Sequence, residues 1–243
     1  MRAKSLLFLL GSLQLALSSP SIASSFQATP VNVEIRAPGA ASSITLKNDG
    51  DAAMNMQVRV FRWSQIDGQE KLEPATEVVA SPPMVTVAAK SEQVIRLVRV
   101  TKSPVSAEEN FRVFVDEIPD PARRKTGQIG VALRYSIPVF IMPSQPSEAQ
   151  LVWSIQRTDN AVYVAATNNG NRRIKISGLQ LKDASGASVS LGEGLIGYVL
   201  ARSSMRWVLP AKAQKLGLNG PVVISARGDD GPINAQATSS PAR

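Results

Sequence analysis

Apolar and polar residues alternate most regularly between residues 129 and 141 of the chain. Every odd position in this stretch is apolar, whereas the even positions mix small, polar and charged residues with apolar Phe140. A period of two residues predicts a β-strand. The run is longer than the roughly 3–10 residues that are usual for strands. One small sandwich would not cover its whole apolar side, so part of it should overhang.

Pro138, within this stretch, refines the prediction. A proline cannot donate a hydrogen bond to a neighbouring strand and is tolerated mainly at sheet edges or bulges. We therefore expect residues 129–141 to form an edge strand. Proteins normally suppress long apolar edges with charge, bulges or cover, because such edges pair with other chains. An edge left this apolar suggests that the strand is lent to another chain.

Shorter alternating segments, separated by turns, fill the rest of the chain. They lie at 31–35, 43–47, 54–63, 84–87, 94–100 and 111–116, and they resume from 151–155 to 222–226. Several end in turn clusters such as Asn48-Asp49-Gly50. This spacing of short strands indicates immunoglobulin-like sandwiches. With 243 residues, 44% of them hydrophobic, the chain has room for two such domains. We predict an all-β protein of two immunoglobulin-like β-sandwich domains.

The N-terminus and a short linker set the expected domain boundaries. Residues 1–23 combine basic Arg2 and Lys4 with an apolar stretch and end in small residues, which is the layout of a cleavable secretory signal. The first domain is expected at 24–143, the linker at 144–148, and the second domain at 149–243, with a frayed tail from Ala235. No long apolar run follows the signal, so we expect no integral membrane segment.

The side-chain inventory argues against an enzyme. The chain has no His and no Cys, which removes the usual general base, the thiolate nucleophile and most transition-metal ligand sets. Residues 192–197 match the G-x-G-x-x-G pattern of dinucleotide sites, but they lead into a strand instead of opening a helix. We therefore expect no catalytic residue, no cofactor and no metal.

The net charge of +8 raises the question of nucleic-acid binding. Two basic clusters, at 123–125 and 172–175, are candidate patches. Export from the cytoplasm argues against this function, and the aromatic content of 5% leaves few platforms on which bases could stack. We interpret both clusters as solvated loop charge and expect no nucleic-acid partner. An acidic protein or an anionic membrane surface stays open as a partner.

Arg96 shares one face of its predicted strand with Val94, Val98 and Val100, so that its guanidinium should point toward an apolar region. A buried arginine needs a paired carboxylate, because an isolated buried charge costs far more than a pair. Glu117, at the end of the strand from residue 111, is the candidate partner. We predict a structural ion pair between Arg96 and Glu117.

Arg112 and Arg134 flank the part of the long strand that could be lent to a partner. Arg112 alternates with apolar Phe111 and Val113, so it should leave the core on the opposite face from them. One interpretation is surface charge that protects a sheet edge. The other is a cation that anchors a partner's C-terminal carboxylate through a forked hydrogen bond. The residues alone leave both open.

Several segments together resemble the periplasmic pilus-assembly chaperones of chaperone–usher systems, a PapD-like superfamily, in their archaic or alternative branch. Beside the N-terminal signal, the segments that carry the resemblance are SITLKN at 43–48, SPP at 81–83, VIRL at 94–97 and FRVFVDEIP at 111–119. The resemblance covers nearly all of the mature chain. Its most specific part is the D-E-I-P element followed by an alternating strand. It implies a boomerang of two immunoglobulin-like domains located in the periplasm.

The resemblance also implies a function. The long strand would be inserted into a pilus subunit that lacks its final strand, until an outer-membrane usher exchanges it for another subunit's extension. The implied donor residues are Ile129, Val131, Leu133 and Tyr135. Association of free copies is a further expectation, because it would cap the exposed edges.

This sequence departs from the better-known pattern of that family in the residues that grip the subunit's carboxylate. That pattern has a lysine on the long strand and an arginine on the first strand. Here Pro138 stands at the lysine position, and only Arg36 lies near the first strand. We hypothesise that Arg112 takes over the anchoring role, with Arg134 and Arg36 as the other candidates.

Two further function classes are alternatives. A secreted structural fibre subunit would be a single domain with an N-terminal donor extension, whereas the candidate donor strand here lies in the middle of the chain. A polyanion-binding β-sandwich module would need exposed aromatic residues or a basic face that the sequence does not clearly display. The sequence also leaves open whether Pro82 or Pro83 follows a cis peptide bond.

Overall fold

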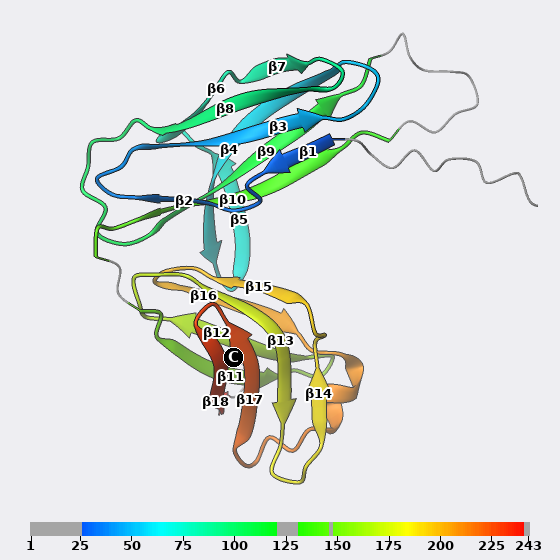
Figure 1. The fold of residues 1–243 in the computed structure, drawn as a ribbon. Helices are drawn as coiled ribbons and strands as arrows, with labels where there is room; N and C mark the ends of the chain where they lie inside the picture. The colour runs from blue at the N-terminus through cyan, green and yellow to red at the C-terminus, as the bar shows by residue number, and fades with distance from the viewer. Residues whose placement is uncertain (1–25, 121–130, 146–147, 241–243) are drawn as a thin grey trace, which may run out of the picture.

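A computed structural model describes residues 26–120, 131–145 and 148–240 of the chain (Figure 1). These residues form β-strands almost throughout, and the one helical element among them is a short 3-10 helix at Ala211–Lys215. Figure 1 shows two β-domains that meet at an angle. The predicted all-β fold of two sandwich-like domains is confirmed.

Two sheets pack face to face in the first domain. The four-stranded sheet has the order β1 (Phe26–Thr29), β3 (Ala41–Asn48), β8 (Ser91–Arg99), β6 (Val78–Ser81). The six-stranded sheet has the order β2 (Val33–Arg36), β10 (Arg134–Met142), β9 (Glu109–Ile118), β4 (Met54–Ile66), β5 (Gln69–Pro74), with β7 (Met84–Val87) paired to β4. Alternating residues of both sheets, such as Leu46, Ile95, Val113 and Val139, fill the core between them. The peptide bond between Ser81 and Pro82, which joins β6 to β7, is cis.

The first strand of the chain changes sheets. β1 runs antiparallel to β3 in the four-stranded sheet, and after a short break β2 runs parallel to β10 in the other sheet. The segment predicted as a strand at 31–35 therefore covers the last two residues of this break and the first three residues of β2. Because β2 is only four residues long, it covers β10 only from Val139 to Met142.

The prediction of an edge strand is correct for one half of β10 and wrong for the other. β9 pairs with β10 from Arg134 to Ile141, whereas pairing with β2 begins only at Val139. Among the described residues, the edge from Arg134 to Pro138 is therefore unpaired on one side, and residues 139–142 lie inside the sheet. The reason is the return of the N-terminal segment to this sheet, a long-range pairing that alternation alone cannot indicate.

The predicted ion pair between Arg96 and Glu117 is wrong. Ile95 and Leu97 are the residues of β8 that enter the core, each 0% exposed, so Arg96 lies exposed on the outer face beside Val94. The Glu117 carboxylate instead accepts a hydrogen bond from the backbone N–H of Leu133, at 3.1 Å. Both faces of β8 carry apolar residues. The larger pair, Ile95 and Leu97, packs in the core, so Arg96 points outward.

The second domain is one eight-stranded sheet rolled around its own core. Its order is β14 (Ser188–Ser190), β13 (Ile174–Lys182), β17 (Val222–Gly228), β18 (Gly231–Ser240), β11 (Leu151–Arg157), β12 (Val162–Asn168), β16 (Ser203–Val208), with β15 (Leu195–Val199) paired to β13. Trp153, Val164, Leu181 and Ile224 are among the buried residues of this core. No helix among the residues described is both long and apolar enough to cross a bilayer.

The tail of the second domain is not frayed as far as residue 240, contrary to the prediction. β18 lies between β17, which runs antiparallel to it, and β11, which runs parallel to it. Residues 231–237 pair with β17 and residues 237–240 pair with β11, so the strand has a partner along its whole length. The small side chain of Ala237, 7% exposed, fits against the core. A polar and small-residue composition did not reveal this strand, because pairing depends on the backbone.

Candidate functional site

The open half of β10 and the residues just before it form the candidate donor edge, residues 131–138. Val131 is 78% exposed, and it has the highest exposed fraction among the large hydrophobic residues described. Leu133 and Tyr135 are partly buried and pack against the core of the first domain. Ile129, the fourth residue expected at this edge, lies outside the described residues. The expected donor positions thus differ in how much apolar surface they still offer.

Tyr135 connects the donor edge to the first strand. Its hydroxyl donates a hydrogen bond to the backbone carbonyl of Phe26 at 2.6 Å, and the two rings meet edge to face with centroids 5.7 Å apart. Phe26 lies at the start of β1 and is 2% exposed. β1 therefore flanks the open part of β10 without forming a ladder with it (Figure 1).

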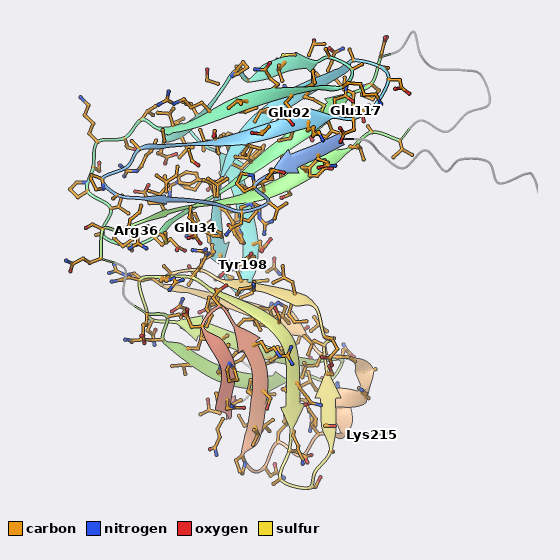
Figure 2. The ribbon with its side chains drawn as sticks, in the orientation of Figure 1. Glu34, Arg36, Glu92, Glu117, Tyr198 and Lys215 are labelled. Carbon is orange, nitrogen blue, oxygen red and sulfur yellow. The ribbon has the colours of Figure 1, made fainter. Side chains whose placement is uncertain are left out.

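The three candidate anchors are spread along β10. Arg134 begins the strand, Arg112 on β9 lies opposite Pro138, and Arg36 on β2 lies opposite Met142. Figure 2 shows Arg36 and Glu34 on the side of the first domain that faces the second, away from Glu117 at the far end of the first domain. The structure does not bring the three guanidinium groups together into one site.

Arg134 is held by an acidic partner. It forms a hydrogen-bonded ion pair with Asp116, whose other oxygen accepts a hydrogen bond from Arg59 Nη2 at 2.7 Å. Burial alone would raise the pKa of Asp116, but the hydrogen bonds from Arg134 and Arg59 outweigh it and lower the pKa below its ordinary value. Arg134 therefore already has a counter-ion, which it contacts through Nε, although its side chain is 59% exposed.

The environment of Arg112 differs from that of Arg134, because Arg112 lies beside the β4–β5 hairpin. Its guanidinium lies 3.9 Å from the centroid of the Trp63 ring, and its side chain is 19% exposed. Nη1 donates to Ser136 Oγ at 3.3 Å, and Nη2 reaches the Glu70 oxygens at 3.3 and 3.5 Å. Nε is buried and has no acceptor among the described residues. Among the three candidates, Arg112 therefore combines a fixed position with an unused donor.

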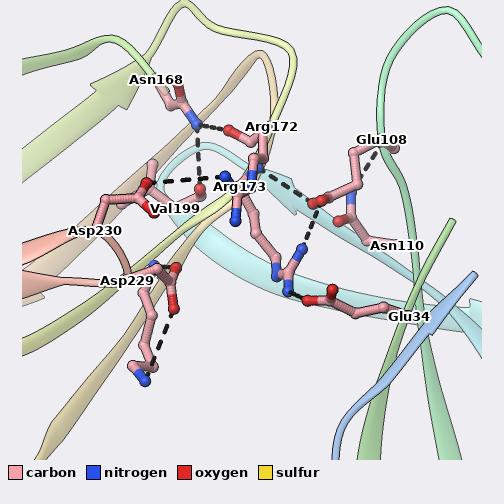
Figure 3. A network of polar contacts seen from close by, with 10 residues as sticks. Glu34, Glu108, Asn110, Asn168, Arg172, Arg173, Val199, Asp229 and Asp230 are labelled. Atoms are coloured by element: carbon pink, nitrogen blue, oxygen red, sulfur yellow. Dashed lines mark hydrogen bonds and ion pairs between the residues drawn. The ribbon is translucent and has the colours of Figure 1, made fainter. Parts of the chain in front are cut away.

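Arg173 is a functional residue that the sequence did not reveal. It projects from the second domain into the first, where Nη1 donates to Glu108 Oε2 at 2.6 Å and Nη2 contacts Glu34 (Figure 3). Its carbon Cζ lies 3.4 Å from the centroid of the Phe140 ring. The interpretation of this cluster as solvated charge is wrong for Arg173, which is 5% exposed. The other basic cluster, at 123–125, lies outside the described residues.

Two neighbours of Arg173, Glu108 and Asn168, define its surroundings at the interface. Burial raises the pKa of Glu108, although the charge of Arg173 and its hydrogen bonds pull that pKa down. On the second domain, Asn168 shapes the loop that presents Arg173: its Nδ2 donates to the carbonyl of Arg172 at 2.7 Å, and its Oδ1 accepts from Gly170 N–H at 2.9 Å.

A small apolar cluster and a hairpin complete the contact between the domains. Trp63 and Phe140 of the first domain pack with Tyr198 and Leu200 of the second. The side chain of Gln65 donates to the carbonyl of Tyr198 at 2.7 Å and accepts from Leu200 N–H at 3.0 Å. The even-numbered apolar residue Phe140 was the sequence signal for this contact, because it lies opposite to the core-facing side of β10.

The described residues contain no group of three or more His, Cys, Asp or Glu side chains that could hold a metal ion. The site can bind a partner in two ways. The strand edge beside exposed Val131 can form backbone hydrogen bonds with another strand, and Arg112, whose Nε has no acceptor among the described residues, can bind an anion.

Comparison with known proteins places this architecture among chaperones. The family model for pili and flagellar-assembly chaperones, PapD N-terminal domain, matches residues 25–147. The "Uncharacterized fimbrial chaperone YhcA" of Escherichia coli (strain K12) is 25% identical over 142 residues. That match spans 58% of this chain and 60% of the relative.

Solved structures share the fold over most of both chains. A chain of the CsuC–CsuE chaperone–tip adhesion subunit pre-assembly complex, from archaic chaperone-usher Csu pili of Acinetobacter baumannii, has a TM-score of 0.70 and 21% identity, with 88% of this chain and 99% of that chain covered. The E. coli chaperone DraB has a TM-score of 0.59 and 22% identity, with coverage of 88% and 97%. A chain of the Salmonella enterica SafA pilin–SafB chaperone complex has a TM-score of 0.61 and 15% identity, with coverage of 89% and 98%. At these identities the likeness shows the fold.

Proposed function

We propose, from the premise that this chain belongs to the family of pili and flagellar-assembly chaperones, that it completes the fold of a pilus subunit that lacks its final strand. The subunit would pair with the open edge of β10 in the periplasm, and an outer-membrane usher would later take it over. Because the family consists of chaperones, the alternatives of a fibre subunit and a polyanion-binding module are not favoured.

The observation that carries this proposal is the donor edge itself. From Arg134 to Pro138, β10 has a neighbour on one side only, and Val131 ahead of it is 78% exposed. A strand added on the open side would satisfy the free backbone groups, while Val131 would enter the groove of the subunit. Full burial of one valine is worth about 1.5–3 kcal/mol. Leu133 and Tyr135 would add less, because they are already partly buried.

Arg112 supports a second part of the proposal, the anchoring of the subunit's C-terminal carboxylate. A guanidinium can hold a carboxylate through two parallel N–H bonds, and the buried Nε of Arg112 has no acceptor among the described residues. Stacking on Trp63 fixes the plane of the guanidinium. Arg134 is a weaker candidate because it already forms an ion pair with Asp116, and Arg36 lies at the other end of β10.

Co-expression with the products of neighbouring reading frames tests the donor edge. We expect a small β-rich subunit to copurify with the chaperone and to become insoluble without it. Val131→Ser together with Leu133→Ser should abolish the rescue while the chaperone remains folded by circular dichroism. Val131→Ser alone should reduce binding roughly tenfold or more, whereas Val208→Ser, at a 62% exposed valine of the second domain, should not change it. A double variant that still protects the subunit would exclude β10 as the donor.

A separate pair of variants tests the anchor. Arg112→Ala should weaken subunit binding, and Arg134→Ala should affect it much less. If Arg112→Ala binds the subunit as tightly as the unmodified chaperone, Arg112 is not the anchor. The donor-edge proposal would then stand without it.

A further inference from the structure

We propose that Glu70 acts as a placeholder counter-ion for Arg112. In the free chaperone it occupies the guanidinium that the subunit's terminal carboxylate would otherwise take, so it lowers the affinity for the subunit and eases its release. This inference rests on the proposed anchoring role of Arg112. It assigns to the β4–β5 hairpin a direct effect on how tightly the subunit is held.

The contact between Glu70 and Arg112 is incomplete. One nitrogen, Nη2, reaches both carboxylate oxygens, at 3.3 and 3.5 Å. Charge-assisted hydrogen bonds between nitrogen and carboxylate oxygen are usually about 2.7–2.9 Å long. The neighbouring Nε is buried and has no acceptor within the part of the chain that is described. Glu70 therefore compensates the charge of Arg112 without using the fork of the guanidinium.

Other arginines of the same domain show what a complete contact looks like. Arg59, Arg62 and Arg99 each engage one carboxylate group through both Nε and Nη2, at distances of 2.5–3.0 Å. Arg112 differs from these three because its Nε is unused. Arg112 thus keeps one N–H donor that Glu70 does not use, at an atom that is covered in the free protein.

The hairpin that carries Glu70 is held by the second domain. The carbonyl of Gly68 accepts a hydrogen bond from Arg206 N–H at 3.0 Å, and Gly68 also forms a parallel bridge with Met205. Gln65, which faces Glu70 across the hairpin, is bound to Tyr198 and Leu200. Figure 1 shows β4 and β5 reaching down to the second domain. The docked hairpin therefore sets how far Glu70 extends toward Arg112.

Glu70, on β5, can leave Arg112 at a low cost in free energy. Within the described ranges β5 pairs with β4 alone, and all six of its residues are exposed. The Glu70 side chain is 38% exposed, so water can solvate the carboxylate when it leaves the guanidinium. An exposed ion pair changes an equilibrium constant by roughly one- to fivefold. This range is small enough for a competing carboxylate to displace Glu70 and large enough to change affinity measurably.

The test replaces Glu70 by glutamine, which removes the negative charge and keeps the shape of the side chain. Glu70→Gln should tighten binding of the copurified subunit roughly two- to fivefold, and slow its dissociation, because the competing charge is gone. Glu73→Gln is the matched control: it lies on the same strand, pairs with Lys71 and should leave the affinity unchanged. In an Arg112→Ala background, Glu70→Gln should have no effect.

A second measurement uses acetate in place of the subunit. The Nε–H resonance of Arg112 can be assigned by NMR from its loss in Arg112→Lys and followed while acetate is added. We expect the acetate concentration at half-shift to fall roughly two- to fivefold in Glu70→Gln. Equal half-shift concentrations in the two proteins would overturn the placeholder role.

The two proposals fail in different ways. If Arg112→Ala leaves subunit binding unchanged, the anchor is wrong and the placeholder falls with it. If Arg112→Ala weakens binding but Glu70→Gln does not strengthen it, the anchor stands and the placeholder alone is overturned.

Discussion

Arg173 of the second domain and Glu108 of the first form an ion pair with 2.6 Å between Nη1 and Oε2, and their side chains are 5% and 0% exposed. The pair is therefore desolvated, and the Glu108 charge depends on Arg173 for compensation, whereas Arg173 also contacts Glu34. Because the two residues belong to different domains, the pair couples the stability of the fold to the relative placement of the domains.

Removing Arg173 should destabilise the contact between the domains. We expect Arg173→Met to lower the free energy of unfolding by about 3–5 kcal/mol near neutral pH, because Glu108 would remain buried without its cation. Urea unfolding followed by tryptophan fluorescence measures the change. Arg172→Met is the control: its ion pair with Asp230 is 3.8 Å long and Asp230 is 80% exposed, so the change should be under about 1 kcal/mol. Equal effects of the two variants would contradict the assigned role of Arg173.

The cost of Arg173→Met should depend on pH. Burial raises the pKa of Glu108 and the charge of Arg173 pulls it down, so loss of Arg173 should raise this pKa further. A carboxyl group whose pKa is higher in the folded state contributes stability at low pH and loses it as pH rises from the unfolded value, about 4.3, through the folded value. The variant should therefore be less impaired at about pH 5 than at about pH 8.

A second substitution checks the source of this pH dependence. In Arg173→Met combined with Glu108→Gln, the buried group no longer titrates, so the urea midpoints measured at the two pH values should differ no more than in the unmodified protein. A pH dependence that survives in the double variant would assign the effect to another group.

Asp116 should contribute to stability with the opposite pH dependence. Burial works to raise its pKa, but hydrogen bonds from Arg134 and Arg59 lower it below its ordinary value. Its contribution is therefore present above the unfolded pKa, about 3.9, and is lost as pH falls through the folded value. Asp116→Asn should lower the urea midpoint at neutral pH, and the difference from the unmodified protein should shrink below about pH 4.

The exposed Asp159 of the second domain provides the comparison for this prediction. Asp159→Asn should shift the midpoint little at any pH. A constant difference between Asp116→Asn and the unmodified protein across the acid range would show that the two arginines do not stabilise the Asp116 charge.

The Tyr135 hydroxyl should hold the first strand beside the donor edge. Tyr135→Phe removes the hydrogen bond to the Phe26 carbonyl, which would cost about 1 kcal/mol. Amide hydrogen exchange in β1 should become faster, since this strand has a ladder only with β3. Tyr163→Phe is the control, because the Tyr163 hydroxyl has no hydrogen-bond partner among the described residues. Unchanged exchange in β1 would contradict the assigned contact.

The alternation of residues was enough to predict several of the longer β-strands and the all-β, two-domain class. It located β3, β4, β8 and β9 because each buries one face, and a half-buried strand has a period of two. It did not reveal β18, whose small residues carry little apolar signal, and it assigned Arg96 to the wrong face of β8. When both faces of a strand carry apolar residues, the local pattern does not say which one meets the core.

The candidate site divides in the same way. The residue pattern predicted an apolar strand around Pro138 with more apolar surface than one small sandwich would cover, and it placed Arg112 outside the core. The three-dimensional fold decided which half of β10 stays open, because β2 returns from the N-terminus to cover residues 139–142. It also decided that Arg173 is buried against Glu108 and that Glu70 faces Arg112. Such pairings join residues far apart in the chain, so no local pattern encodes them.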